Sequence, residues 1–83
     1  NMAIFDKQAA KAGAMMLNAI LKTAIKKWKD KGAPEFSIMI TPDIETEQFI
    51  GYVYTKNTTT GKMERSMKKT AADLLLFLSE NSQ

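Results

Sequence analysis

Lysines in the first third of the chain recur at a spacing that places them on one side of an α-helix. At about 100° per residue, they fall within an arc of about 100°. These residues are Lys7, Lys11, Lys22, Lys26 and Lys29. A row of ammonium groups on one helix face is suited to contacts with the phosphates of a nucleic-acid backbone.

A second group of cations lies between residues 62 and 69. Lys68 and Lys69 come just before a predicted helix, and the free backbone N–H groups at a helix N-terminus favour phosphate. We therefore predict a nucleic-acid-binding surface that consists of Lys22, Lys26, Lys29, Lys62, Arg65, Lys68 and Lys69. The alternative is that scattered lysines form a solvated face, with those at the end of the first helix complementing its dipole.

The composition argues against catalysis. The chain contains no histidine and no cysteine, which excludes zinc fingers, Cys–His nucleophile pairs and the Ser-His-Asp triad. Asp43, Glu45 and Glu47 alternate along the chain, but neither EF-hand spacing nor a histidine supports a metal site, and a charged edge strand is the favoured explanation of these residues. We predict a non-enzymatic protein with no catalytic residue, no metal and no cofactor.

Length and charge indicate one small domain. The chain has 83 residues, 45% hydrophobic and 25% charged, with a formal net charge of +3. Asn1 precedes Met2 and is expected to be a cloning remnant, so the predicted domain spans residues 2–83. Because we find no cysteine, no apolar span and no signal peptide, we expect a cytoplasmic protein.

The first predicted element is a long helix from about Ala3 to Asp30, because apolar residues recur there three or four positions apart. Gly32 and Pro34 should end it. Its predicted buried face consists of Gly13, Met16, Leu17, Ile20, Leu21, Ala24 and Trp28.

Three strands are predicted next. In the segment 35–41, Phe36, Ile38 and Ile40 alternate with the residues Ser37, Met39 and Thr41, which is typical of a sheet with one buried face. The segment 48–56 is rich in aromatic and β-branched residues. Its Gly51 indicates a bulge or the close approach of another backbone. The segment 62–67 is the third predicted strand.

A short helix should close the fold. Thr70 and Asp73 have the spacing of a capping box, and the helix should run to about Glu80. Its predicted inward residues are Ala71, Leu74, Leu75 and Leu78, while Leu76 and Phe77 point elsewhere. The predicted fold is α+β with the order α-β-β-β-α, a three-stranded antiparallel sheet packed against a long N-terminal and a short C-terminal helix.

The length of the first helix suggests a dimer. About 28 helical residues span roughly 42 Å, whereas a compact domain of this size is about 30 Å across. The helix should therefore project and be covered by a second copy, or kink at Gly13 and fold back. The predicted homodimer interface consists of Ile4, Phe5, Ala9, Gly13, Leu76 and Phe77.

The segment from Ser66 to Ala72 is similar to the start of the last helix in double-stranded-RNA-binding domains, which share the order α-β-β-β-α. The chain departs from that family in its longer first helix, in lacking a Gly-Pro-x-His segment between the first two strands, and in lacking a third lysine in the last helix. We therefore do not assign it to that family. The resemblance implies recognition of shape rather than base sequence.

The sequence thus predicts a small binding protein that contacts a DNA or RNA backbone through its lysines. The alternative is a protein-interaction module, such as a small phage- or mobile-element-type inhibitor or regulator, acting as a homodimer. The amphipathic first helix could also lie on a membrane. We predict no membrane partner, because the strands would then lose the helix that covers Phe36, Ile38 and Ile40.

Overall fold

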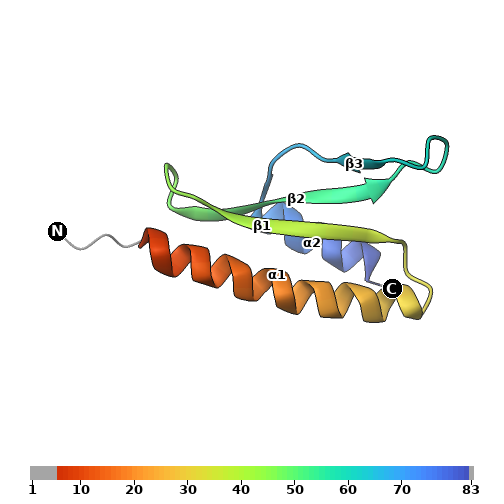
Figure 1. The fold of residues 1–83 in the computed structure, drawn as a ribbon, viewed down its shortest axis with the longest axis horizontal. Coiled ribbons are helices and arrows are strands. Elements are labelled where there is room, and N and C mark those ends of the chain that lie inside the picture. Colours follow the sequence, from red (N-terminus) through yellow and green to blue (C-terminus); the bar gives the residue numbers. More distant parts are fainter. Residues whose placement is uncertain (1–5, 83) are drawn as a thin grey trace.

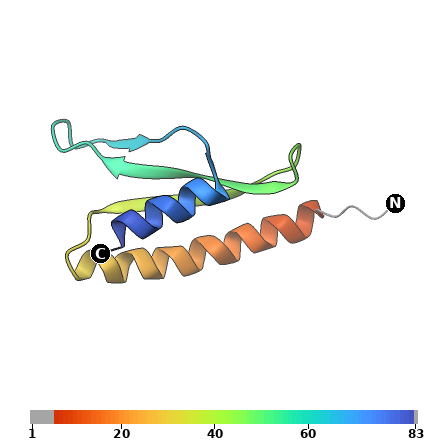
Figure 2. The ribbon, with the colours of Figure 1, turned by 180° about the vertical axis from the view of Figure 1, so that it is seen from behind.

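The computed structural model describes residues 6–82. Its elements are α1 (Lys7–Asp30), β1 (Phe36–Asp43), β2 (Gln48–Lys56), β3 (Met63–Arg65), β4 (Lys69–Thr70) and α2 (Ala71–Asn81). Both helices lie on the same side of the sheet and run in the same direction (Figures 1 and 2). The predicted α+β arrangement is therefore confirmed, and within residues 6–82 no helix lies on the opposite face of the sheet.

The antiparallel sheet is centred on β2, with the strand order β1-β2-β3 and with β4 also pairing with β2. The third strand predicted for residues 62–67 is shorter than expected. It ends at Arg65, and at the next residue the Ser66 hydroxyl oxygen accepts the Val53 N–H at 2.9 Å while the Ser66 N–H donates to the Val53 carbonyl at 2.8 Å. The side chain replaces a main-chain partner there, so the strand stops and the chain rejoins β2 only at β4.

Helix α1 begins at the N-cap residue Asp6, whose carboxylate accepts the N–H groups of Gln8 and Ala9. It passes unbroken through Gly13, so the predicted alternative of a kink at that residue is wrong. The helix ends just before Gly32, which has a φ of 101°. The predicted start at Ala3 lies outside the described residues. Within residues 6–82, no helix combines the length and the apolarity needed to cross a membrane.

The face that α1 turns toward the sheet differs from the predicted one. Ala10, Ala14 and Ile25 are buried, and Leu21 and Trp28 pack against the core. The prediction was wrong for three members of the apolar stripe, which are exposed to solvent: Met16, Leu17 and Ile20.

Asn18 explains this rotation of α1. Its side-chain Nδ2 donates to the Ile40 carbonyl oxygen at 3.0 Å, and its Oδ1 accepts the Ile40 N–H at 2.6 Å. One amide side chain thus satisfies both main-chain groups of a residue on an edge strand. The contact face was predicted from the spacing of apolar residues alone, which does not count a polar residue such as Asn18. The predicted face was therefore rotated about the helix axis from the one observed.

The core lies between the inner face of the sheet and the two helices. The predicted alternation in β1 is confirmed, because Phe36, Ile38 and Ile40 are all buried. They pack with Ala14, Ile25, Val53 and Leu74. Val53 is the most deeply buried of the core side chains, with 2% of its surface exposed.

In α2 the predicted capping box is confirmed, since Thr70 and Asp73 exchange hydrogen bonds at 3.2 and 3.4 Å. The predicted inward face is partly wrong. Leu74 is buried, but Leu75 is 68% exposed. Phe77, predicted to point away from the core, packs edge-to-face on Phe36 with ring centroids 5.0 Å apart. Five consecutive apolar residues carry no periodic contrast, so packing on Phe36 decides which of them face inward.

At Gly51 the predicted close approach of another backbone is found in part, since the nearest atom belongs to a side chain. A Cβ atom at this position would lie 2.7 Å from the Cδ1 atom of Leu74 and 3.0 Å from the Met39 carbonyl oxygen. We expect Gly51→Ala to lower the free energy of unfolding by about 1–3 kcal/mol, because the buried Leu74 side chain and the Met39 carbonyl group must shift to make room for the methyl group. Chemical denaturation measures this change.

Gly13→Ala is the matched control, because its methyl group meets only the edge of the Phe49 ring, at 3.3 Å. Alanine also favours a helix over glycine by about 1 kcal/mol. This variant should be at least as stable as the unaltered protein. Equal stability of Gly51→Ala and Gly13→Ala would contradict the close packing of α2 on β2.

Candidate nucleic-acid interface

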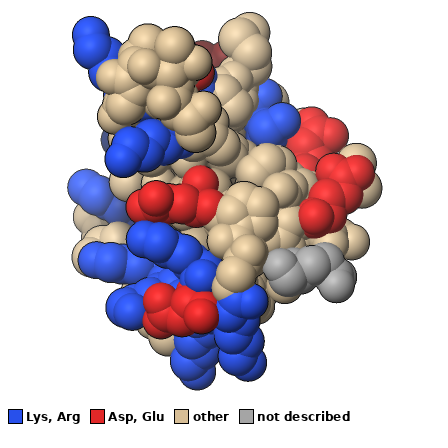
Figure 3. All heavy atoms as spheres, turned by 90° about the vertical axis from the view of Figure 1, so that its right-hand side faces the viewer, with Lys and Arg blue, Asp and Glu red and all other residues tan. Residues whose placement is uncertain are grey.

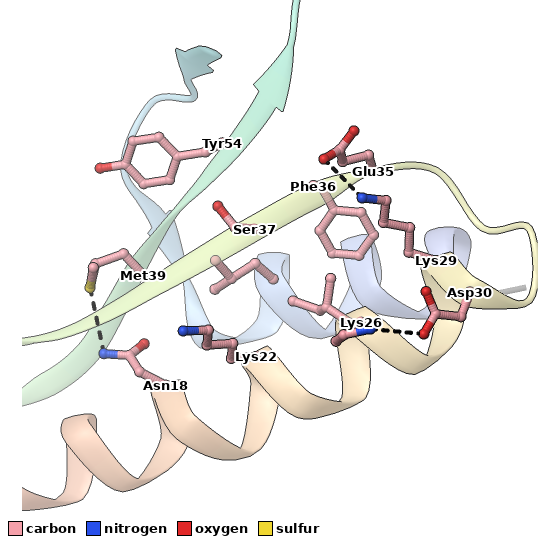
Figure 4. Close-up of a pocket in the computed structure, with 12 residues that line it drawn as sticks. Asn18, Lys22, Lys26, Lys29, Asp30, Glu35, Phe36, Ser37, Met39 and Tyr54 are labelled. Carbon is pink, nitrogen blue, oxygen red and sulfur yellow. Dashed lines mark hydrogen bonds and ion pairs between the residues drawn. The ribbon is translucent and has the colours of Figure 1, made fainter.

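The lysines of the predicted surface are brought together in part. Lys22, Lys26 and Lys29 line a groove of about 650 Å³ between α1 and the outer edge of β1. They come from successive turns of α1, and Ser37, Met39 and Tyr54 line the opposite side (Figure 4). The groove therefore joins a row of helix cations to the sheet.

Two of these lysines form exposed ion pairs on the rim of the groove. The Lys26 Nζ lies 3.0 Å from the Asp30 carboxylate, and the Lys29 Nζ lies 3.2 Å from the Glu35 carboxylate. Lys22 makes no ion pair within residues 6–82. Exposed pairs of this kind contribute about 0–1 kcal/mol, so a phosphate can replace either carboxylate at little cost.

The edge of β1 adds main-chain donors to the groove. Residues of an antiparallel edge strand alternately point their N–H and C=O groups toward the neighbouring strand and away from it. The Asn18 bonds to Ile40 show that the outward set includes Ile40, and by alternation it includes Phe36 and Ile38. Both residues line the groove, so their N–H groups are available to a ligand there.

The outer face of the sheet carries two tyrosines. Tyr52 and Tyr54 lie two residues apart on β2, opposite Met39 and Ser37 of β1. Arg65 is paired with Tyr54 across β2 and β3, and its guanidinium carbon lies 4.7 Å from the centroid of the Tyr52 ring. Tyr54 also lines the lysine groove. One aromatic side chain is therefore shared by the groove and the open face.

The other predicted cations do not join the groove. Lys62 is exposed in the loop before β3. Lys68 lies 3.7 Å from the Asp43 carboxylate, and Lys69 pairs with Gly51 at the other end of β2. In the end-on view of Figure 3, Lys and Arg gather over one part of the molecule with carboxylates among them. The seven predicted cations thus form separate groups.

The predicted site residues did not include Asn18, Ser37 or Tyr54. The alternation that places Val53 inward also places Tyr52 and Tyr54 outward, so a signal for the tyrosines was present. No local pattern reveals Asn18 or Ser37, because their positions in the groove depend on the packing of α1 beside β1.

Asp43, Glu45 and Glu47 do not lie together on one extended strand. Residues 44–47 form a turn rather than an extended strand, and Glu47 has a positive φ of 54°. Asp43 is paired with Lys68. Across the described part of the chain, no group of three or more metal-ligating side chains comes together.

The residues of the predicted homodimer interface are dispersed. Ala9 is exposed on the first turns of α1, whereas Gly13 faces the Phe49 ring. Leu76 is exposed on α2, and Phe77 packs on the core. Ile4 and Phe5 lie outside the described residues.

Comparison with known proteins finds no matching protein family, no similar curated protein and no similar solved structure. The groove and the adjoining sheet face are therefore the basis for assigning a function. They offer cations, main-chain N–H donors and an aromatic ring on neighbouring surfaces. Proteins that bind single-stranded nucleic acids combine a cationic groove with aromatic side chains on which bases stack.

Proposed function

We propose that the protein binds single-stranded nucleic acid in the groove between α1 and β1, without catalysis. The observation that carries this proposal is that Tyr54 lines both the lysine groove and the open face of the sheet. A backbone in the groove can meet lysines while one of its bases stacks on a tyrosine. The proposal retains the predicted role of Lys22, Lys26 and Lys29.

The chemistry of the groove favours a single strand over a duplex. Phosphates contact Lys22 first and then displace the carboxylates of Asp30 and Glu35 from their lysines. A base reaches Tyr54 only if it is unstacked from its neighbours, as it is in a single strand. Arg65, held over Tyr52 on the same face, extends the surface on which bases and phosphates can lie.

Binding should fall steeply with salt. If the protein contacts three phosphates of a single strand, we expect its affinity to fall about 20-fold between 50 and 200 mM salt, because condensed counterions are released on binding. Fluorescence anisotropy with labelled single-stranded DNA, single-stranded RNA and duplexes measures this effect. We expect the single strands to bind more tightly than the duplexes.

The matched variants are two double substitutions on α1. Lys22→Ala with Lys26→Ala removes two groove lysines and should weaken binding about tenfold or more. Lys7→Ala with Lys11→Ala removes the same charge at the same spacing, outside the groove, and should have a smaller effect. Equal losses from both, or no binding at the lower salt concentration, would refute a specific role for the groove.

The open edge of β1 favours a second candidate, an extended acidic peptide that adds a strand beside Phe36 and Ile38. Such a peptide would use the carbonyl groups as well as the N–H groups, and its carboxylates would contact the same lysines. This candidate predicts binding that is insensitive to Tyr54→Ala, whereas stacking predicts a loss of about 1–3 kcal/mol. A peptide should also slow hydrogen exchange at the Phe36 and Ile38 amides.

A further inference from the structure

The helical layer contains a second groove, which is entirely apolar. It lies between α1 and α2, has a volume of about 330 Å³, and is lined only by apolar side chains. Its walls include Leu17, Ile20, Leu75 and Leu78, and its floor includes the core residues Ile38 and Ile40. The groove is thus a place where the hydrophobic core is open to solvent.

The rims of this groove project apolar side chains. Ile20 on α1 is 59% exposed and Leu75 on α2 is 68% exposed. Met16, one helical turn before Ile20, and Leu76, next to Leu75, are also exposed. A helix that is apolar on all sides, as α2 is from Leu74 to Leu78, is normally buried, so this surface indicates an interface.

The exposed area of the chain is larger than its mass requires. The total is 6403 Å², whereas a compact monomer of this mass exposes about 5,000 Å². If the residues outside 6–82 are assigned the full exposed area of an unfolded chain, the area that remains is still about 700 Å² larger than that of a compact protein with the mass of residues 6–82. Each partner in a standard protein–protein interface buries about 800 Å².

We propose that a second copy of this chain covers the α1–α2 groove, forming a two-fold symmetric dimer. The surface is self-complementary, because the projecting Leu75 lies directly beside the groove that can receive the same side chain from another copy. No charged residue lines the groove, so two copies of equal charge meet there without local repulsion.

This dimer leaves the proposed nucleic-acid interface open. Ile20 and Lys22 lie two residues apart, which is about 200° around the helix axis, so the two grooves occupy different flanks of α1. The interface also differs from the one predicted from the sequence, with which it shares only Leu76. The proposal does not depend on nucleic-acid binding, and the two can fail independently.

Sedimentation equilibrium from micromolar to millimolar protein concentrations tests the dimer. We expect a mass twice the 9.3 kDa of the chain. The dimer should persist at high salt, where binding through the lysines is lost, because burial of apolar surface is not screened. A single-chain mass over the whole range would overturn the proposal.

Leu75→Glu should weaken the dimer at least 100-fold, because it places a carboxylate in the apolar groove of the second copy. Met67→Glu is the matched control: Met67 is 86% exposed in the link between β3 and β4, away from the groove, so the dimer should be unaffected. Ile20→Glu provides a second variant if Leu75→Glu alters the circular dichroism spectrum. An unchanged dimer affinity in the folded groove variant would refute this interface.

Discussion

Phe36→Ala is expected to lower the free energy of unfolding by about 3–5 kcal/mol, because the lost ring leaves a cavity in the core. Phe36 is buried at the start of β1 and meets the Phe77 ring edge-to-face at 5.0 Å. This pair connects the sheet to α2. Since native proteins have a total stability of about 5–15 kcal/mol, the variant should lose a large fraction of its stability.

Denaturant titration followed by the fluorescence of Trp28, the single tryptophan of the chain, measures this loss. Ser37→Ala is the control on the neighbouring position, which is exposed on the outer face, and it should change stability by about 0.5 kcal/mol or less. A loss below about 1 kcal/mol for Phe36→Ala would contradict the packing of α2 on β1.

The second large effect is expected at Asn18. Replacement by alanine removes both hydrogen bonds to Ile40 and leaves a partly buried N–H and C=O without their partner. Each unsatisfied group costs about 1–3 kcal/mol. We therefore expect Asn18→Ala to lower the free energy of unfolding by about 2–4 kcal/mol and to loosen α1 from the edge of the sheet.

Native-state hydrogen exchange gives this prediction a local readout, because the Ile40 amide should exchange faster in the variant than in the unaltered protein. Thr23→Ala is the control on the same helix. The Thr23 hydroxyl donates only to the Ala19 carbonyl of its own helix, at 3.3 Å and in an exposed position, so its loss should cost about 0.5 kcal/mol or less. Unchanged exchange at Ile40 would show that Asn18 does not hold the two elements together.

Much of the fold could be predicted where the sequence alternates apolar and polar residues or carries a local capping signal. The inward set of β1 is alternating, and β2 was predicted with the bounds that the structure has. The capping box of Thr70 and Asp73 involves residues three positions apart, so no distant partner is needed to form it. Gly51 indicated a close approach because no side chain fits there, although its partner Leu74 could not be identified.

The candidate site could be predicted only in part. The period of α1 placed Lys22, Lys26 and Lys29 on one face, and the structure brings all three to one groove. That Tyr54 lies across this groove follows from the register between β1 and β2, which pairs it with Ser37. Register joins residues far apart in the sequence, so no local spacing encodes it.

Local sequence therefore determined the type and order of the elements, because hydrogen bonds and periodic burial within an element involve near neighbours. Only the tertiary structure decided how each helix is rotated. The hydrogen bonds between Asn18 and Ile40 set the rotation of α1. The packing of Phe77 on Phe36 makes Phe77, and not Leu75, the inward residue of α2. These rotations created both the lysine groove and the apolar groove, since each groove lies between surfaces that come from distant parts of the chain.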